Sequence, residues 1–165
     1  MINPKKAGMW MVVIIMFILL GQIALAQSGS LKSWGYNYYG QLGDGTTTDR
    51  HTPVSVSGGI TTAVSVSAGL EHTCAVLSDH TVKCWGYNDN GQLGDGTTTN
   101  SLTPVSVSGI TNAINVSTSY KHTCAVLSDH TVKCWGYNDF GQLGDNTIID
   151  KHIPVIVSGI TTAVS

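Results

Sequence analysis

Charged residues are scarce in this chain, and their scarcity narrows the functions that it can have. Only 11% of the 165 residues are Asp, Glu, Lys or Arg, whereas soluble domains carry about 25%. The formal net charge of −2 provides neither a basic surface for nucleic acid nor a strong acidic field. We therefore expect no nucleic-acid partner.

The motifs of common active sites are missing as well. The sequence contains no G-x-S-x-G nucleophile elbow, no glycine-rich phosphate loop and no H-E-x-x-H zinc motif. Ser, Asp and His do stand together in the segment LSDHT, but this segment occurs twice. A catalytic site normally brings different groups together in one pocket. We predict a protein that is not an enzyme and that holds neither a cofactor nor a metal.

Long apolar runs are confined to the N-terminus. Two lysines precede the apolar residues 9–20, and the small-x-small sequence ALA ends at Ala26. This pattern predicts a secretory signal peptide over residues 1–26 that is cleaved after Ala26. The alternative is a retained membrane anchor, because the apolar segment approaches the roughly 20 residues that span a bilayer. Either interpretation places residues 27–165 across a membrane, in a secreted, periplasmic or cell-surface location.

The rest of the chain is repetitive. The segment HTCAVLSDHTVKCWGYND at residues 72–89 recurs letter for letter at residues 122–139. Trp34, Trp85 and Trp135 mark the same phase, 51 and then 50 residues apart. Such a fixed period is the mark of a repeat architecture. It divides residues 27–165 into tandem repeats: 33–83, 84–133 and an incomplete 134–165.

Each repeat has the pattern of short strands, and nothing in it has the length or period of a helix. One repeat is expected to contain four short strands: residues 53–56, which open it with a proline, then 63–67, 73–77 and 81–85. Residues 63–67 alternate apolar and polar side chains, as a half-buried strand does. The last two segments flank a three-residue hairpin loop that ends at His80. This loop type needs positive φ at its last residue, a conformation that histidine adopts more readily than most side chains.

The order of the motifs resembles a known repeat. A GQLGDGT-like block follows WGYN, then comes a strand with proline, and then a hairpin like GLEHTCAVLSDHTVKCWG. This arrangement over residues 33–165 resembles the regulator of chromosome condensation repeat, in a secreted, bacterial-type member that is truncated. The resemblance implies an all-β fold, a partial β-propeller of four-stranded antiparallel blades. At about fifty residues per blade, residues 33–165 supply about two full blades and incomplete end blades. A complete propeller needs roughly 4 to 8 blades.

The four cysteines form two pairs, Cys74 with Cys84 and Cys124 with Cys134. A hairpin centred on its loop places the members of each pair opposite each other, within the separation that a disulfide bridges. Ser33 stands where the later repeats have Cys84 and Cys134. Residues 31–35 around it are expected to form a lone fourth strand, without the hairpin partner that would carry a second cysteine. We predict two disulfides. The alternative is zinc bound by each cysteine pair and a nearby histidine, although structural zinc usually takes four protein ligands.

Two further residue types have a structural and a functional interpretation. The tryptophan of each repeat is expected to pack between blades, the alternative being a ladder that stacks on a ligand. Asp44, Asp95 and Asp145 lie in glycine-rich turns. We expect them to bond backbone amides there, rather than to bind calcium.

Binding residues are sought where the copies differ, because a rigid repeat carries its function on variable loops. The variable positions contribute aromatic and arginine side chains, which are the usual energetic anchors of interfaces. The candidates are Tyr38, Tyr39, Arg50, Tyr120 and Phe140. Neutral drift of the loops is the alternative.

The leading hypothesis is an exported, non-catalytic scaffold that binds a protein or a cell-surface glycan. One alternative is a regulator resembling the family's guanine-nucleotide exchange factor. Another is a non-catalytic accessory part of a longer surface enzyme that acts on polysaccharides. Contact with a membrane is expected only through an uncleaved N-terminal segment. A homo-oligomer that closes the ring is a further option but is not favoured.

Overall fold

The computed structural model describes residues 22–27 and 30–164, and every regular element in them is a β-strand. The first sheet contains β1 (Gln22–Gln27), β2 (Ser30–Gly35) and β3 (Arg50–Ser55). The second contains β4 (Ala63–Ala68), β5 (His72–Leu77), β6 (Val82–Gly86) and β7 (Ser101–Ser106). The third contains β8 (Ala113–Thr118), β9 (His122–Leu127), β10 (Val132–Gly136) and β11 (Lys151–Ile156).

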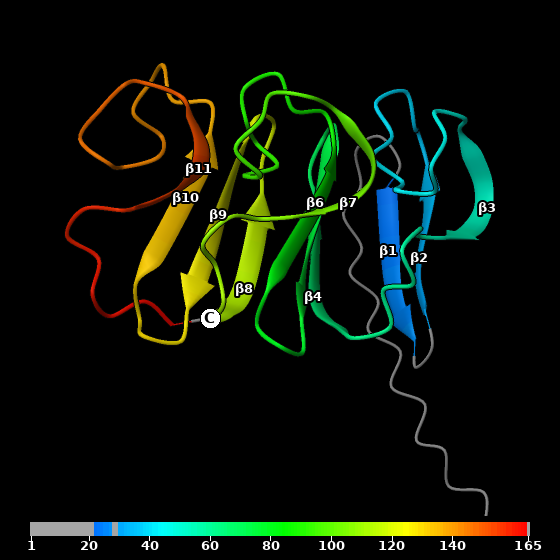
Figure 1. Ribbon diagram of the computed structural model, residues 1–165, viewed down its shortest axis with the longest axis horizontal. Helices are drawn as coiled ribbons and strands as arrows, with labels where there is room; N and C mark the ends of the chain where they lie inside the picture. Colours follow the sequence, from blue (N-terminus) through cyan, green and yellow to red (C-terminus); the bar gives the residue numbers. More distant parts are fainter. Residues whose placement is uncertain (1–21, 28–29, 165) are drawn as a thin grey trace, which may run out of the picture.

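Each sheet is an antiparallel meander in which strands that follow one another in the chain also pair in space. The three sheets stand side by side in chain order (Figure 1), and β8 packs on both β4 and β5 of the preceding sheet. This arrangement confirms the all-β fold with four-stranded antiparallel blades.

The grouping of strands into blades differs from the sequence-based expectation. The strand with Pro53 was expected to open a blade, but β3 pairs with β2 and closes the preceding sheet. Likewise, the segment around residues 31–35 was expected to be a lone strand and instead lies between β1 and β3. The period of the sequence fixes the repeat length but not its phase, because only inter-strand hydrogen bonds decide which neighbour a strand joins.

The predicted leader falls partly outside the described residues, which begin at residue 22. Residues 22–26 lie in β1, so cleavage after Ala26 would remove this strand from the first sheet, whereas a retained anchor would keep it. Within the described part of the chain, the structure contains no helix with the length and apolarity to span a membrane.

The two copied hairpins have the predicted geometry. Cys74 lies opposite Cys84, and Cys124 lies opposite Cys134, with the sulfur atoms of each pair 2.09 Å apart. The hairpin loops end in left-handed residues, as expected, with φ of 63° at His80. The imidazole Nδ1 of His80 also lies 3.1 Å from the carbonyl oxygen of Ala113, so the hairpin tip holds the start of β8 in the next sheet.

Neighbouring sheets are joined by a contact set that occurs twice. The indole Nε1 of Trp85 donates to the backbone oxygen of Gln41 at 2.9 Å, and Thr73 Oγ1 donates to the same oxygen. The ring lies against Gly43, where an added Cβ would come within 2.7 Å of the indole nitrogen. At the next junction Trp135 and Thr123 donate in the same way to Gln92.

These junctions bury the apolar core. Trp85 and Trp135 are fully buried, which confirms the packing role expected for them. One apolar cluster joins the second and third sheets and includes both sulfurs of the Cys74–Cys84 disulfide. A second cluster joins the first and second sheets around Leu31 and Trp85. The core therefore lies between the sheets and not within any one of them.

Candidate functional site

The loops that follow β2, β6 and β10 are each held by one buried asparagine. In the first loop Asn37 Nδ2 donates to the carbonyl oxygens of Thr46 and Thr48, while its Oδ1 accepts from the amide of Leu42. Asn88 and Asn138 form the same bonds in the other loops. Because buried hydrogen bonds hold the loop backbone, the exposed side chains of the loop are presented in a fixed arrangement.

The aspartates of these loops perform turn chemistry, as predicted. Asp44 Oδ1 accepts from the backbone amide and the hydroxyl of Thr46, at 2.9 and 2.7 Å. Asp95 and Asp145 accept equivalent bonds. Hydrogen bonds from Thr46 and Arg50, together with the charge of Arg50, hold the pKa of Asp44 below its ordinary value, although burial acts in the opposite direction.

Aromatic side chains from these loops and from the turn between β8 and β9 form a continuous row, which we call the aromatic band. Its first half belongs to the first and second sheets. The rings of Tyr36 and Tyr38 are stacked with centroids 6.4 Å apart, Tyr38 meets Tyr39 edge-on at 4.9 Å, and Tyr39 lies 4.7 Å from Tyr87. The loops that carry these rings lie at the upper edge of the sheets in Figure 1.

The second half of the band is organised around Lys121. Its ammonium nitrogen lies 6.0 Å from the ring centre of Tyr87, 5.3 Å from that of Tyr120 and 5.8 Å from that of Tyr137. Such distances allow cation–π attraction, which links the second and third sheets. Tyr137 in turn lies 6.2 Å from Phe140. The aromatic band thus crosses all three sheets, and its members are Tyr36, Tyr38, Tyr39, Tyr87, Tyr120, Tyr137, Phe140 and Lys121.

Carboxylates border the band and fix its hydroxyl groups. Tyr87 donates to Asp89 Oδ2 at 2.9 Å, and Tyr137 donates to Asp139 Oδ2 at the same distance. Burial, and then the bond to the negative charge of Asp89, raise the pKa of Tyr87 to about 12. Burial also raises the pKa of Glu71, which faces both Lys121 and Asp89. The band is therefore an aromatic surface with one cation and several carboxylates.

The structure brings together four of the five residues predicted for binding. Tyr38, Tyr120 and Phe140 are 64%, 52% and 86% exposed, a large solvent-facing area for aromatic side chains. Tyr39 joins the two halves of the band. Arg50 does not join it, because its Nε donates to Asp44 Oδ2 at 2.8 Å inside the first loop.

Sequence reasoning missed Tyr36, Tyr87, Tyr137 and Lys121. The three tyrosines occur in every copy of WGYN and were passed over, since only variable positions were considered. The signal that could have found them is their place beside the variable residues, one or two positions away in the same loop. Lys121 lies in a segment that differs between copies, but only the three rings around its ammonium group set it apart from other surface lysines.

Metal binding finds no support in the side chains that the structure describes. No group of three or more His, Cys, Asp or Glu residues stands close enough there to hold an ion. The zinc alternative also needs thiolates, whereas the four cysteine sulfurs lie in pairs at disulfide bonding distance. His72, its third ligand, is fully buried and lies 2.8 Å from the hydroxyl of Thr123.

Comparison with known families gives matches over most of the chain. Residues 28–76, 79–126 and 129–165 match the model described as the regulator of chromosome condensation (RCC1) repeat. Residues 63–92 and 113–142 match a second model with the same description. The matched windows have the same period of about fifty residues as the predicted repeats and the observed sheets. The three differ only in the residue at which each repeat begins.

Individual proteins match smaller parts. The chain is 40% identical over 88 residues to the ultraviolet-B receptor UVR8 of Arabidopsis thaliana, which covers 52% of the chain and 20% of the receptor. It is 37% identical over 87 residues to the RCC2 homolog of Danio rerio, covering 52% of the chain and 18% of that protein. The chain thus spans about a fifth of the length of these relatives.

Among solved structures, yeast RCC1 bound to Kap60 superposes with a TM-score of 0.75. The sequence identity is 17%, and the match covers 84% of this chain and 35% of the yeast protein. This likeness shows the fold, and the bound partner is a property of the yeast protein.

Proposed function

Because the chain belongs to the regulator of chromosome condensation (RCC1) repeat family, we propose that it is a non-catalytic module that binds a protein outside the cytoplasm through the aromatic band. The single observation that carries this proposal is the continuity of the band across three sheets. Exposed aromatic side chains on a rigid base are the usual anchors of protein interfaces.

The chemistry of the band favours a partner segment with basic and apolar side chains. Its rings offer π-faces to a cation, and Asp89 and Asp139 are exposed beside them. Lys121 is already surrounded by three rings and by Glu71, so the band itself has little uncompensated positive charge. An arginine of the partner could stack on a tyrosine and pair with a carboxylate at once.

The proposed location rests on the cysteines. Both cysteine pairs lie at disulfide distance, and disulfides persist in oxidising compartments. Titration of thiols in freshly isolated protein, without reductant, tests this part of the proposal. We expect no free thiol, whereas four titratable thiols would place the chain in a reducing compartment.

The binding proposal is tested by comparing two variants of the whole chain as baits for envelope proteins. The band variant carries Tyr38→Ser, Tyr120→Ser and Phe140→Ser, three exposed positions whose loss leaves the core intact. The control variant carries Val64→Ser, Ile148→Ser and Ile153→Ser, which are also exposed and lie outside the band. Each lost anchor costs at least about 1 kcal/mol, so binding to the band variant should weaken more than tenfold.

Equal retention of every captured protein by both variants would refute a role of the band. Retardation of the wild-type chain in polysaccharide gels, together with loss of that retardation in the band variant, would instead identify a glycan as the ligand. Circular dichroism of all three proteins is the control for folding.

A further inference from the structure

One position of the repeat carries opposite charges at the two junctions that the aromatic band crosses. Residues 72–89 and 122–139 are identical, so Glu71 is the counterpart of Lys121. The backbones agree as well, because Tyr87 N donates to Glu71 O and Tyr137 N donates to Lys121 O, both at 2.9 Å. The two side chains therefore leave the backbone at equivalent points of neighbouring junctions.

Lys121 shows which kind of group this position of the junction accommodates. Its ammonium nitrogen lies 5.3 to 6.0 Å from the ring centres of Tyr87, Tyr120 and Tyr137. Aromatic faces attract a cation at such distances. At the junction between the second and third sheets, the chain thus supplies its own cation to the rings.

The preceding junction has the rings but carries a carboxylate in place of the ammonium group. Tyr39 and Tyr87 are half-buried, with ring centres 4.7 Å apart. Burial, and then the negative charge of Glu71, raise the pKa of Tyr39, so the carboxylate lies near this ring. Among the residues that the structure describes, the Glu71 side chain forms neither a hydrogen bond nor an ion pair. Aromatic faces beside an unpaired carboxylate are the two features that attract an organic cation.

The charges around this junction do not cancel. Glu71 faces one ammonium group, that of Lys121, and one further carboxylate, that of Asp89. Asp89 is exposed and accepts a hydrogen bond from the hydroxyl of Tyr87. Two carboxylates beside one ammonium group leave an excess negative charge at the rings, which a cation from outside would neutralise.

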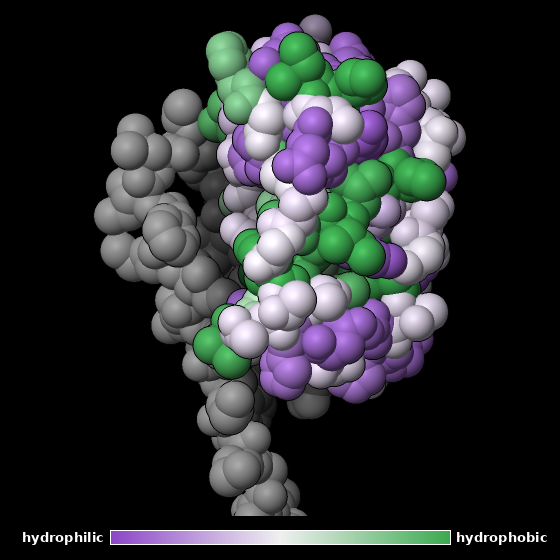
Figure 2. Space-filling view, turned by 90° about the vertical axis from the view of Figure 1, so that its left-hand side faces the viewer, coloured by the Kyte–Doolittle hydropathy of each residue, from purple (hydrophilic) through white to green (hydrophobic). Residues whose placement is uncertain are grey.

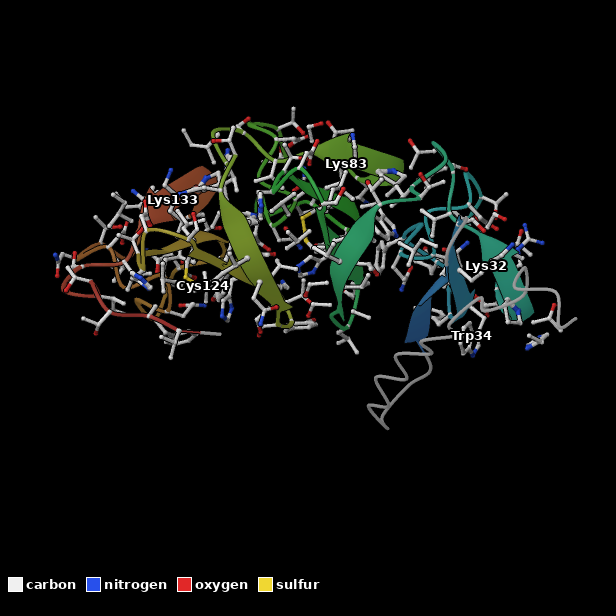
Figure 3. All side chains as sticks on the ribbon, turned by 90° about the horizontal axis from the view of Figure 1, so that it is seen from below. Lys32, Trp34, Lys83, Cys124 and Lys133 are labelled. Atoms are coloured by element: carbon white, nitrogen blue, oxygen red, sulfur yellow. A yellow bond between two sulfur atoms is a disulfide. The ribbon has the colours of Figure 1, made fainter. Side chains whose placement is uncertain are left out.

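The other cations in the described part of the chain are engaged elsewhere. Two of them are ion-paired, Arg50 with Asp44 and Lys151 with Asp145. Three more lie one in each sheet, on β2, β6 and β10, and donate to neutral oxygen atoms: Lys32, Lys83 and Lys133 (Figure 3). A cation that pairs with Glu71 therefore has to come from a second molecule.

The loop edge of the sheets is open to such a molecule. Tyr36 and Tyr38, from the same loop as Tyr39, are 45% and 64% exposed. Figure 2 looks onto the side of the third sheet and shows apolar and hydrophilic residues next to each other at the upper end, where the loops lie. A segment that carries a cation among apolar side chains matches a surface of this mixed character.

We propose that Glu71, together with the rings of Tyr39 and Tyr87, is the subsite of the aromatic band for a side-chain cation of the partner, either a guanidinium or an ammonium group. This inference rests on the protein-binding function proposed above and names the group that is recognised. A guanidinium group is the better ligand, because it is planar and can stack on a ring while it pairs with a carboxylate. Lys121 occupies the equivalent place at the next junction and so closes it to the partner.

Titration of the full chain with a small cation, followed by the NMR signals of the tyrosine rings, tests the subsite. N-acetylargininamide should shift the ring signals of Tyr39 and Tyr87 to saturation, N-acetyllysinamide should do so at higher concentration, and the neutral isostere N-acetylcitrullinamide should not. Glu71→Gln keeps the shape, removes the charge and should weaken binding about tenfold. Asp79→Asn, which removes an exposed carboxylate at a hairpin tip, is the matched control and should bind as the unchanged chain does.

Exchanging the charges of the two junctions gives a second test. Glu71→Lys supplies an internal ammonium group and should abolish the shifts of Tyr39. Lys121→Glu should create a second subsite, so that Tyr120 and Tyr137 also shift and two probe molecules bind per chain. A misfolded chain cannot produce this gain of binding.

Equal shifts with the citrulline probe, or an unchanged affinity of Glu71→Gln for the arginine probe, would overturn the subsite. Its failure can be told apart from failure of the binding function. If an envelope protein is lost by the band variant but kept in full by Glu71→Gln, the aromatic band remains an interface and only the cation subsite is refuted.

Discussion

Two stretches of this molecule share the same eighteen letters and yet have different surroundings. Residues 72–89 form β5 and β6 in the middle sheet, and residues 122–139 form β9 and β10 in the third sheet. Every residue of β5 is buried, whereas buried and half-buried residues alternate along β9. Identical sequences fold to the same hairpin here, and a neighbouring sheet decides how much of that hairpin is buried.

Removing apolar volume from both hairpins should give the largest difference between them. Val76 and Val82 are completely buried, while Val126 and Val132 are half-buried. We expect Val76→Ala with Val82→Ala to lower the free energy of unfolding by about 3–4 kcal/mol, and the pair at 126 and 132 by about half as much. Urea unfolding followed by circular dichroism measures both losses. Equal losses would mean that the neighbouring sheet does not decide how much each hairpin contributes to stability.

His72 and His122, the first residues of β5 and β9, should differ in how much stability they lose at low pH. This difference should be smaller than that between the two valine pairs. Complete burial, and then the proximity of His122, lower the pKa of His72 to about 3, whereas half-buried His122 is shifted downward by burial alone. The unfolded chain therefore binds more protons than the folded chain between pH 6.5 and 3. Stability due to His72 is complete above pH 6.5 and declines as the pH falls, by about 2 kcal/mol at pH 5.

Unfolding curves between pH 7.5 and 5 test this expectation. The variant His72→Gln should flatten the pH dependence more than its matched control, His122→Gln. A slope that the first substitution leaves unchanged would show that folding does not lower the pKa of His72.

The two disulfides should differ in the rate at which they are reduced, and this is the smallest of the three expected differences. Both sulfurs of Cys74–Cys84 lie in the apolar cluster between the second and third sheets, whereas Cys124 is half-buried on the outer side of the third sheet. Thiol–disulfide exchange requires access of the attacking thiolate. Under native conditions dithiothreitol should reduce Cys124–Cys134 several-fold faster, as peptide mapping after alkylation would show. Equal rates in the native state would indicate that reduction proceeds through global unfolding.

The sequence predicted the fold well and the candidate site in part. The copied hairpins, their cysteine register and the left-handed His80 follow from local patterns, and the structure has all three. Tyr38, Tyr39, Tyr120 and Phe140 were found because they vary between copies. Arg50 also varies between copies, but it lies apart from the aromatic band, since its ion pair with Asp44 closes within its own loop.

What the sequence alone determined is the local unit: strands, turns, hairpins and the fifty-residue period, all set by contacts between residues close in the chain. The tertiary structure decided which strands share a sheet and which of two identical hairpins is buried. It also decided that Lys121 stands near Tyr87 of the second sheet and Tyr137 of the third. These features depend on distant segments meeting in space. Because the copies have nearly the same sequence, their different burial depends on which sheets lie next to each copy.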